Sequence, residues 1–169
     1  TAGLLSLVIS FVANSYNITD GVDGLAGGLL MISLVPVAVI AGSLGASGIA
    51  LFAVTLLGSM IAFLYFNIAP ARIFMGDAGS MAFGSILAIL IIMMGQIHVL
   101  PLLAGVFLFE AATSLLQWGS KILLKRKLFT IAPFHHLLEF KGWDSAKITS
   151  RFWLAGIVLV LLSLGVFYL

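Results

Sequence analysis

The sequence predicts an all-α fold, a polytopic transmembrane helical bundle with about six spans. Of the 169 residues, 62% are hydrophobic and only 8% are charged, and the mean hydropathy is +1.25. A soluble domain carries about 25% charged residues and about 45–50% apolar ones. Long apolar stretches alternate with short segments rich in Gly, Asn, Asp and Pro, and the charges are confined to a few of these segments. These observations exclude a water-soluble globular protein.

Six apolar stretches approach the roughly 20 residues that a helix needs to cross the hydrocarbon core. They are residues 4–16, 25–41, 49–66, 81–96, 101–118 and 152–169. The second stretch contains Pro36, which a membrane helix tolerates as a kink. The first is short and has no basic residues before it, so we expect it to be part of a helix whose beginning lies outside the sequence. Residues 1–169 then form a single transmembrane domain.

The charged residues predict which way the bundle faces. Alternating spans place the loops at about 17–24, 67–80 and 119–151 on one side, and every charge except Glu110 lies on that side. Seven of the eight Lys and Arg residues lie between Lys121 and Arg151. This excess predicts a cytoplasmic face beside anionic membrane lipid and argues against nucleic acid as a partner. The absence of cysteine excludes disulfides and cysteine-ligated metals.

The first polar motif is N-S-Y-N-I-T-D-G-V-D-G-L-A-G-G at residues 14–28. It places Asn17, Asp20 and Asp23 just before an apolar helix, and a glycine follows each aspartate. Glycine permits unusual backbone angles and close approach of a ligand. Two readings of Asp23 stay open, a functional carboxylate or a cap of the following helix.

The second motif is F-N-I-A-P-A-R-I-F-M-G-D-A-G-S at residues 66–80, again before an apolar helix. The amino end of a helix attracts phosphate through its free N–H groups and positive dipole end. A carboxylate at such a place repels phosphate unless a cation lies between them, and Mg²⁺ takes one or two carboxylates together with phosphate oxygens. Asp77 is therefore the expected Mg²⁺ ligand, and an ordinary turn is the alternative.

The third motif is A-P-F-H-H-L-L-E-F-K-G-W at residues 132–143, whose alternation suggests a short helix at the membrane interface. The adjacent His135 and His136 do not share a helical face, which disfavours zinc, but histidine at a phosphate site can donate hydrogen bonds or shuttle protons. Histidines without a partner are the alternative. For Glu110, inside the fifth span, a structural hydrogen bond is favoured over a direct function. Gln117 could line the same site.

Together the three motifs resemble the polyprenyl-phosphate N-acetylhexosamine-1-phosphate transferase superfamily. N-I-T-D-G-V-D-G-L-A is similar to its central aspartate motif and F-M-G-D-A-G-S to its magnesium-site motif. A-P-F-H-H-L-L-E-F-K-G-W, followed by R-F-W, resembles the branch that transfers phospho-N-acetylmuramoyl-pentapeptide. The resemblance implies the C-terminal half of a parent with roughly ten spans, in the bacterial cytoplasmic membrane, with the active face cytoplasmic. Where the family usually has a third consecutive histidine, this sequence has Leu137.

The resemblance also implies substrates and residue roles. UDP-N-acetylmuramoyl-pentapeptide and undecaprenyl phosphate would give UMP and the lipid-linked sugar, with Mg²⁺ as cofactor and a homodimer as a possible assembly. The fragment alone would be inactive. The implied site has Asp77 as metal ligand, Asp20, Asp23, His135 and His136 as catalytic residues, and Asn17, Asn67, Phe74, Gly76 and Gln117 as substrate-binding residues.

Three other functions stay open at this point. The first is a sister enzyme that transfers N-acetylglucosamine-1-phosphate to a polyprenyl phosphate for O-antigen or teichoic acid. The second is a transporter, which would place its binding site near the bilayer midplane, whereas these carboxylates gather at one surface. The third is a structural half without catalytic activity.

Overall fold

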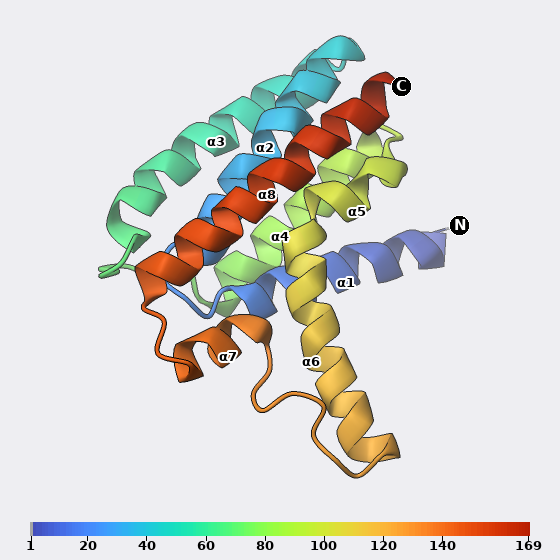
Figure 1. Ribbon diagram of the computed structural model, residues 1–169. Coiled ribbons are helices and arrows are strands. Elements are labelled where there is room, and N and C mark those ends of the chain that lie inside the picture. The colour runs from blue at the N-terminus through green and yellow to red at the C-terminus, as the bar shows by residue number, and fades with distance from the viewer. Residues whose placement is uncertain (1) are drawn as a thin grey trace.

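The computed structural model describes residues 2–169, and all regular secondary structure in them is helical (Figure 1). Five helices are long and apolar enough to cross a membrane, or six spans if a bent pair is counted as one span. The predicted all-α membrane bundle is thus confirmed. The elements are α1 Ala2–Thr19, α2 Leu25–Ser43, α3 Ser47–Asn67, α4 Gly76–Met93, the 3₁₀ turn η1 Ile97–Val99, α5 Leu100–Leu103, α6 Gly105–Leu123, α7 Phe134–Phe140 and α8 Ser145–Tyr168.

The helices continue beyond the apolar stretches, so the loops are shorter than predicted. α1 runs on to Thr19, whose hydroxyl donates to the Ser15 carbonyl oxygen at 2.8 Å. α8 begins at Ser145, where the Asp144 carboxylate caps the helix by accepting from the Lys147 N–H at 2.6 Å. The Asp144 cap satisfies an N–H group at the start of α8 that has no partner within the helix.

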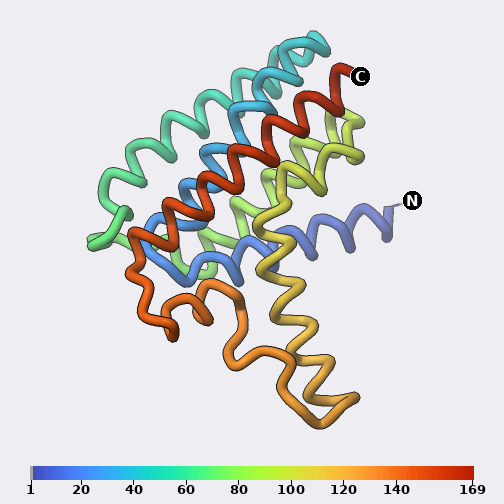
Figure 2. The backbone as a smooth tube through the Cα atoms, viewed as in Figure 1, coloured from blue at the N-terminus to red at the C-terminus, as the bar shows by residue number. Residues whose placement is uncertain are grey.

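The predicted fifth span is not one straight helix. Residues 97–103 and α6 meet at 74°, and the break lies at Ala104. Beyond it, α6 runs away from the bundle, and the chain returns through a long loop to α7 (Figures 1 and 2). Just after the break α6 packs closely on α8, because a methyl group at Gly105 would lie 2.7 Å from Leu159 Cδ1.

α2 is the central helix of the bundle. It packs against α3 and α8, and its buried residues include Leu25, Leu30 and Leu34, each fully inaccessible. Small residues allow close helix contacts, as is usual in membranes: a methyl group at Gly84 of α4 would lie 2.8 Å from the Ala13 Cα of α1, and one at Gly156 of α8 would lie 2.8 Å from Leu29 Cδ2. The outer faces of α3 and α8 expose large apolar side chains that suit lipid.

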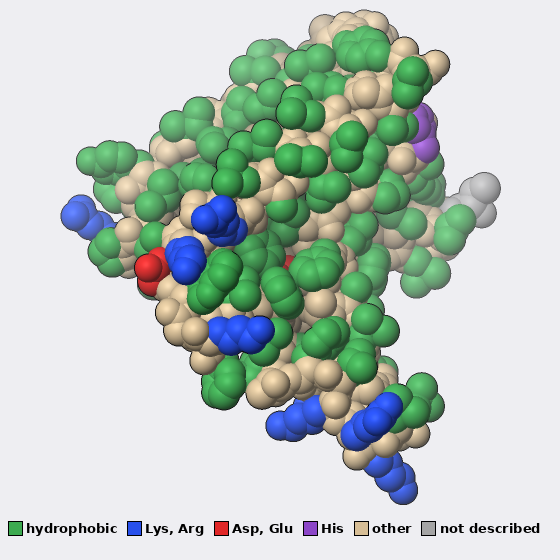
Figure 3. Space-filling view, viewed as in Figure 1, with side chains coloured by type: hydrophobic (Ala, Val, Ile, Leu, Met, Phe, Trp, Pro, Cys, Tyr) green, Lys and Arg blue, Asp and Glu red, His purple; other side chains and the backbone are tan. Residues whose placement is uncertain are grey.

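The loops that follow α1, α3 and α7 meet at one end of the bundle. Asn67 and Asp23 join the first two loops, and Thr149 at the start of α8 donates to the Asp23 carbonyl oxygen at 2.8 Å. Hydrophobic side chains cover most of the face in Figure 3, whereas Lys and Arg side chains gather toward this end and over the far end of α6. The polar motifs of the sequence are therefore brought together in space.

Candidate active site: an acidic pocket beside an apolar groove

A small cavity of about 170 Å³ opens where the first two loops meet. Its lining combines carboxylates, amides and glycines from the end of α1, the loop after it, and the segment between α3 and α4. We call it the acidic pocket. Its residues are Asn17, Asp20, Gly21, Val22, Asp23, Asn67, Phe74, Gly76 and Asp77. Every predicted site residue of the first two motifs lies in this lining.

Asn67 ties the two loops together at the last residue of α3. Its Oδ1 accepts from the Gly24 N–H at 3.2 Å, and its Nδ2 donates to the Ile73 carbonyl oxygen at 2.8 Å. The side chain is only 4% exposed, so these bonds are shielded from water. We expected Asn67 to bind substrate, and the structure shows that both ends of its amide already serve the frame of the pocket.

Asp23 supports the same frame. Its Oδ2 accepts from the Ala71 N–H at 3.0 Å across the two loops. The alternative that Asp23 caps the following helix is wrong, because the cap position of α2 is Gly24 and no side chain caps it. Gly24 has φ +73° and Gly76 has φ +67°, left-handed values that favour glycine. The chain thus turns sharply into both α2 and α4 at the pocket.

Asp20 and Asp77 are the carboxylates that face the pocket without a protein partner. Within residues 2–169, a hydrogen bond to the protein engages the carboxylate of Asp23 but neither of these two. Burial, and secondly the negative charge of Asp77, raise the pKa of Asp20 to about 6. The repulsion between two negative charges that face one small cavity is relieved when a cation binds between them.

This donor set fits Mg²⁺. Among residues 2–169, no three His, Asp or Glu side chains gather into a ready-made metal cage. Mg²⁺ rarely uses such a cage, since it keeps waters and binds one or two carboxylates together with substrate phosphates. Asp77 lies exposed in the first turn of α4, where the helix dipole also favours an anionic ligand. Asp77 and Asp20 are thus the residues able to hold the ion.

The predicted short helix of the third motif exists as α7, and its two histidines face different surroundings. His135 is fully buried, and its Nδ1 lies 3.1 Å from Oε2 of the equally buried Glu110. Its ring packs directly on Gly21 of the acidic pocket, because a methyl group at Gly21 would lie 2.6 Å from His135 Nε2. The structure therefore brings His135 to the wall of the pocket.

His136 and Gln117 are not in the pocket lining. The side chain of His136 is 44% exposed, and its Nδ1 pairs with Glu139 Oε2 at 2.6 Å. The Gln117 amide forms hydrogen bonds with the loop after α6. Its Oε1 accepts from the N–H groups of Leu128 and Phe129, and its Nε2 donates to the Phe129 carbonyl oxygen. Gln117 holds this loop in place and stands apart from the acidic pocket.

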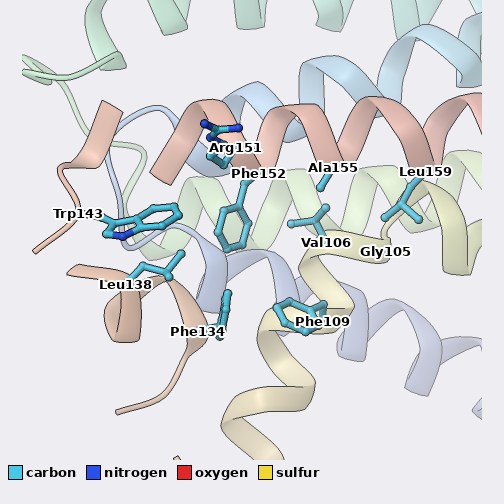
Figure 4. A pocket seen from close by; sticks show the side chains of 10 residues that line it. All are labelled: Gly105, Val106, Phe109, Phe134, Leu138, Trp143, Arg151, Phe152, Ala155 and Leu159. Carbon is cyan, nitrogen blue, oxygen red and sulfur yellow. The ribbon is translucent and has the colours of Figure 1, made fainter. Parts of the chain in front are cut away.

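An apolar groove of about 550 Å³ lies between α6, α7 and α8 (Figure 4). None of the three motifs predicts it. Phe134 and Leu138 are four residues apart on one side of α7, and both point into it. Arg151 is the one charged side chain in the lining. The remaining lining residues are Gly105, Val106, Phe109, Trp143, Phe152, Ala155 and Leu159. The i, i+4 spacing of Phe134 and Leu138 is the signal that could have shown an apolar side of α7.

Comparisons with known proteins identify a family and relatives of this chain. The sequence profile described as Glycosyl transferase family 4 matches residues 1–95, which include the acidic pocket. The chain is 37% identical over 176 residues to the phospho-N-acetylmuramoyl-pentapeptide-transferase of Solibacter usitatus, an alignment that covers 95% of this chain and 47% of that protein. It is 38% identical over 161 residues to the protein of that name from Moorella thermoacetica, covering 95% and 51%.

A third relative of the same name, from Staphylococcus haemolyticus, is 38% identical over 154 residues, covering 91% of this chain and 48% of that protein. The chain spans about half the length of the curated relatives it matches. The family match, the helical membrane bundle and the aspartate pocket at its polar end lead to one conclusion: this chain belongs to glycosyl transferase family 4.

Proposed function

We propose that the full-length protein that contains this chain transfers phospho-N-acetylmuramoyl-pentapeptide from its UDP donor to undecaprenyl phosphate, with release of UMP. One observation carries this proposal: α7 contacts a small acidic pocket through His135, which lies against Gly21, and lines a larger apolar groove with Phe134 and Leu138. A water-soluble nucleotide sugar and a lipid need two such compartments side by side. The names of relatives that are 37–38% identical support the choice of donor sugar.

The acidic pocket would take the donor. Asp77 and Asp20 would hold Mg²⁺, which when bound would neutralise the negative charge that develops on the departing UMP. Phe74, 74% exposed at the pocket, offers an aromatic face to the uracil. Asn67 and Asp23 keep the two loops at a fixed separation, so the donor meets a frame that is already formed.

The apolar groove would take the polyprenyl chain of the acceptor. Its aromatic and aliphatic lining suits a hydrocarbon, and Arg151 offers a charge for the lipid phosphate. In the reaction, an oxygen of the lipid phosphate would attack the β-phosphorus of the donor. A new P–O bond forms, the bond from the β-phosphorus to the bridging oxygen breaks, and UMP leaves with that oxygen.

The proposed location is the bacterial cytoplasmic membrane, which the protein would cross several times with the acidic pocket on the cytoplasmic side. The excess of Lys and Arg in the loop between α6 and α8 supports this orientation. A transporter would place its binding residues near the bilayer midplane. The carboxylates of the acidic pocket lie at the ends of helices instead, which favours chemistry at the membrane surface.

The test is UMP release by the purified full-length protein with undecaprenyl phosphate and Mg²⁺. UDP-N-acetylmuramoyl-pentapeptide and UDP-N-acetylglucosamine are compared as donors. We expect release with the muramoyl donor alone, and its loss when EDTA removes the metal. Release with the glucosamine donor would move the protein to the sister enzymes, and release with neither donor would overturn the proposed transferase.

A further inference from the structure

Glu110 and His135 form a buried polar pair between α6 and α7. Both side chains are fully inaccessible to solvent, and Glu110 Oε2 lies 3.1 Å from His135 Nδ1. The same oxygen accepts from the backbone N–H of His135 at 3.4 Å. Two contacts from one carboxylate oxygen hold both the start of α7 and the orientation of the imidazole ring.

The pair leaves polar atoms without partners. His135 Nε2 and Glu110 Oε1 are both buried and make no hydrogen bond in the part of the chain that the structure describes. A buried polar atom without a partner is costly and calls for an explanation. His135 Nε2 lies against Gly21, and Gly21 itself lines the acidic pocket. The unsatisfied nitrogen is thus separated from the pocket only by a residue without a side chain.

A second His–Glu pair shows that this arrangement is not a general feature of α7. His136 and Glu139 pair at 2.6 Å on the next position of the helix, but their side chains are 44% and 36% exposed. An exposed pair loses little when it is broken, because water replaces each partner. Glu110 and His135 have no such replacement, so their contact fixes the ring.

We infer that Glu110 is a positioning residue: it holds the His135 ring through Nδ1, so that Nε2 meets an anionic oxygen of the nucleotide-sugar donor beside Gly21. This inference rests on the proposed function, since it needs a phosphorylated donor in the acidic pocket. Carboxylate and phosphate oxygens both accept hydrogen bonds, so Nδ1 would donate to Glu110 and Nε2 to the donor. Donor binding then supplies the partner that Nε2 lacks.

The first experiment compares Glu110→Gln with Glu139→Gln in the full-length protein. UMP release with UDP-N-acetylmuramoyl-pentapeptide gives kcat and KM for the donor. Removing a side chain that orients a functional histidine costs roughly 10- to 100-fold at metal sites, and we expect a loss of that order in kcat/KM for Glu110→Gln. Glu139→Gln, which breaks the exposed pair, should change kcat/KM less than about threefold.

A double-mutant cycle separates positioning from a merely structural role. If Glu110 acts through His135, then Glu110→Gln should cost less than about threefold in a His135→Asn background. A structural role would give the same loss in both backgrounds. His135→Gln places an amide nitrogen near the position of Nε2, whereas His135→Asn places one near Nδ1, so His135→Gln should retain more activity.

Gly21→Ala tests the same contact from the other side. The added methyl group would collide with His135 Nε2, so we expect it to lower kcat/KM roughly tenfold in the native background and little in His135→Asn. This variant answers the question even if Glu110→Gln fails to fold. Equal losses in both backgrounds, or full activity of a folded Glu110→Gln, would overturn the inference. An inactive wild-type protein would instead overturn the proposed function, so the two failures are distinguishable.

Discussion

α7 contacts the acidic pocket through His135 and lines the apolar groove with Phe134, and the two sites are built by different forces. The pocket is small, about 170 Å³, and hydrogen bonds from Asn67 and Asp23 hold its loops. The groove is larger, about 550 Å³, and rests on packed helices and aromatic side chains (Figure 4). Consecutive residues of α7 serve both, since Phe134 faces the groove while His135 lies against Gly21 of the pocket.

The difference shows how one membrane surface can accept two unlike molecules. Polar loops at helix ends can present carboxylates to water, whereas the groove needs helix faces that suit hydrocarbon. A change in the pocket should therefore affect the donor and the metal, and a change in the groove should affect the lipid acceptor. The following predictions test this separation in the full-length protein.

The largest effect is expected for Asp77→Asn. The amide keeps the shape of the side chain but removes the charge proposed to hold Mg²⁺, so kcat should fall roughly 10³-fold. UMP release at several Mg²⁺ concentrations measures it. The matched control is Asp144→Asn, which changes the aspartate that caps α8 and should leave kcat nearly unchanged. Full activity of Asp77→Asn would exclude this residue as a metal ligand.

Filling the groove should act on the acceptor alone. Ala155→Phe places a ring in the apolar groove, and we expect KM for undecaprenyl phosphate to rise roughly tenfold because the ring displaces the lipid chain. KM for the nucleotide donor should stay constant. Leu161→Phe, on a 62% exposed position of the same helix, is the control. An equal rise in both KM values would contradict the separation of pocket and groove.

The pH dependence of metal binding should reflect Asp20. Its pKa is raised to about 6, so the carboxyl takes up a proton as the pH falls through 6, and that proton competes with the cation. Mg²⁺ affinity should fall roughly tenfold from pH 7 to pH 5, as calorimetric titration of the metal alone would show. The effect on folding has the opposite sign. The folded state holds this proton more tightly than the unfolded state, so the contribution of Asp20 to the free energy of unfolding increases as the pH falls from 6 to 4. Metal affinity that is constant from pH 7 to pH 5 would exclude Asp20 from the site.

The smallest effect is expected for Asn67→Ala. The substitution leaves the Gly24 N–H and the Ile73 carbonyl without their partner, which should lower the free energy of unfolding by about 1–3 kcal/mol. The shift in Tm of the detergent-solubilised protein measures it. Asn14→Ala is the control, because the Asn14 amide donates to the Ser10 carbonyl oxygen on the exposed side of α1. Equal shifts in the two variants would show that the Asn67 bridge does not stabilise the pocket.

Much of the site could be predicted because the chemistry lies in short motifs. Asp20, Asp23 and Asp77 stand beside glycines at predicted helix starts, and the structure places all three in one pocket lining. Roles within the pocket were harder to predict. Asn67 and Asp23 carry the same polar groups as substrate-binding residues would, and only their distances to Gly24 and Ala71 show that they hold the loops.

The bend before α6 could not be predicted from composition. Residues 101–118 read as one apolar stretch, yet the axis turns by 74° between residues 97–103 and α6. This turn sends α6 away from the bundle (Figure 2). The apolar groove lies between α6, α7 and α8. Gln117, placed in the site by its position in the sequence, follows α6 outward and holds the loop instead.

The sequence by itself determined that this protein is a helical membrane bundle whose aspartates and basic residues lie in the loops and at the helix ends. Hydropathy and charge are local properties, and each apolar span is stabilised by the lipid independently of the others. Only the tertiary structure decided that Glu110 reaches His135 across 25 positions, that His135 lies against Gly21, and that an apolar groove forms between α6, α7 and α8. These contacts join segments far apart in the chain, and they depend on helix packing angles that no local pattern encodes.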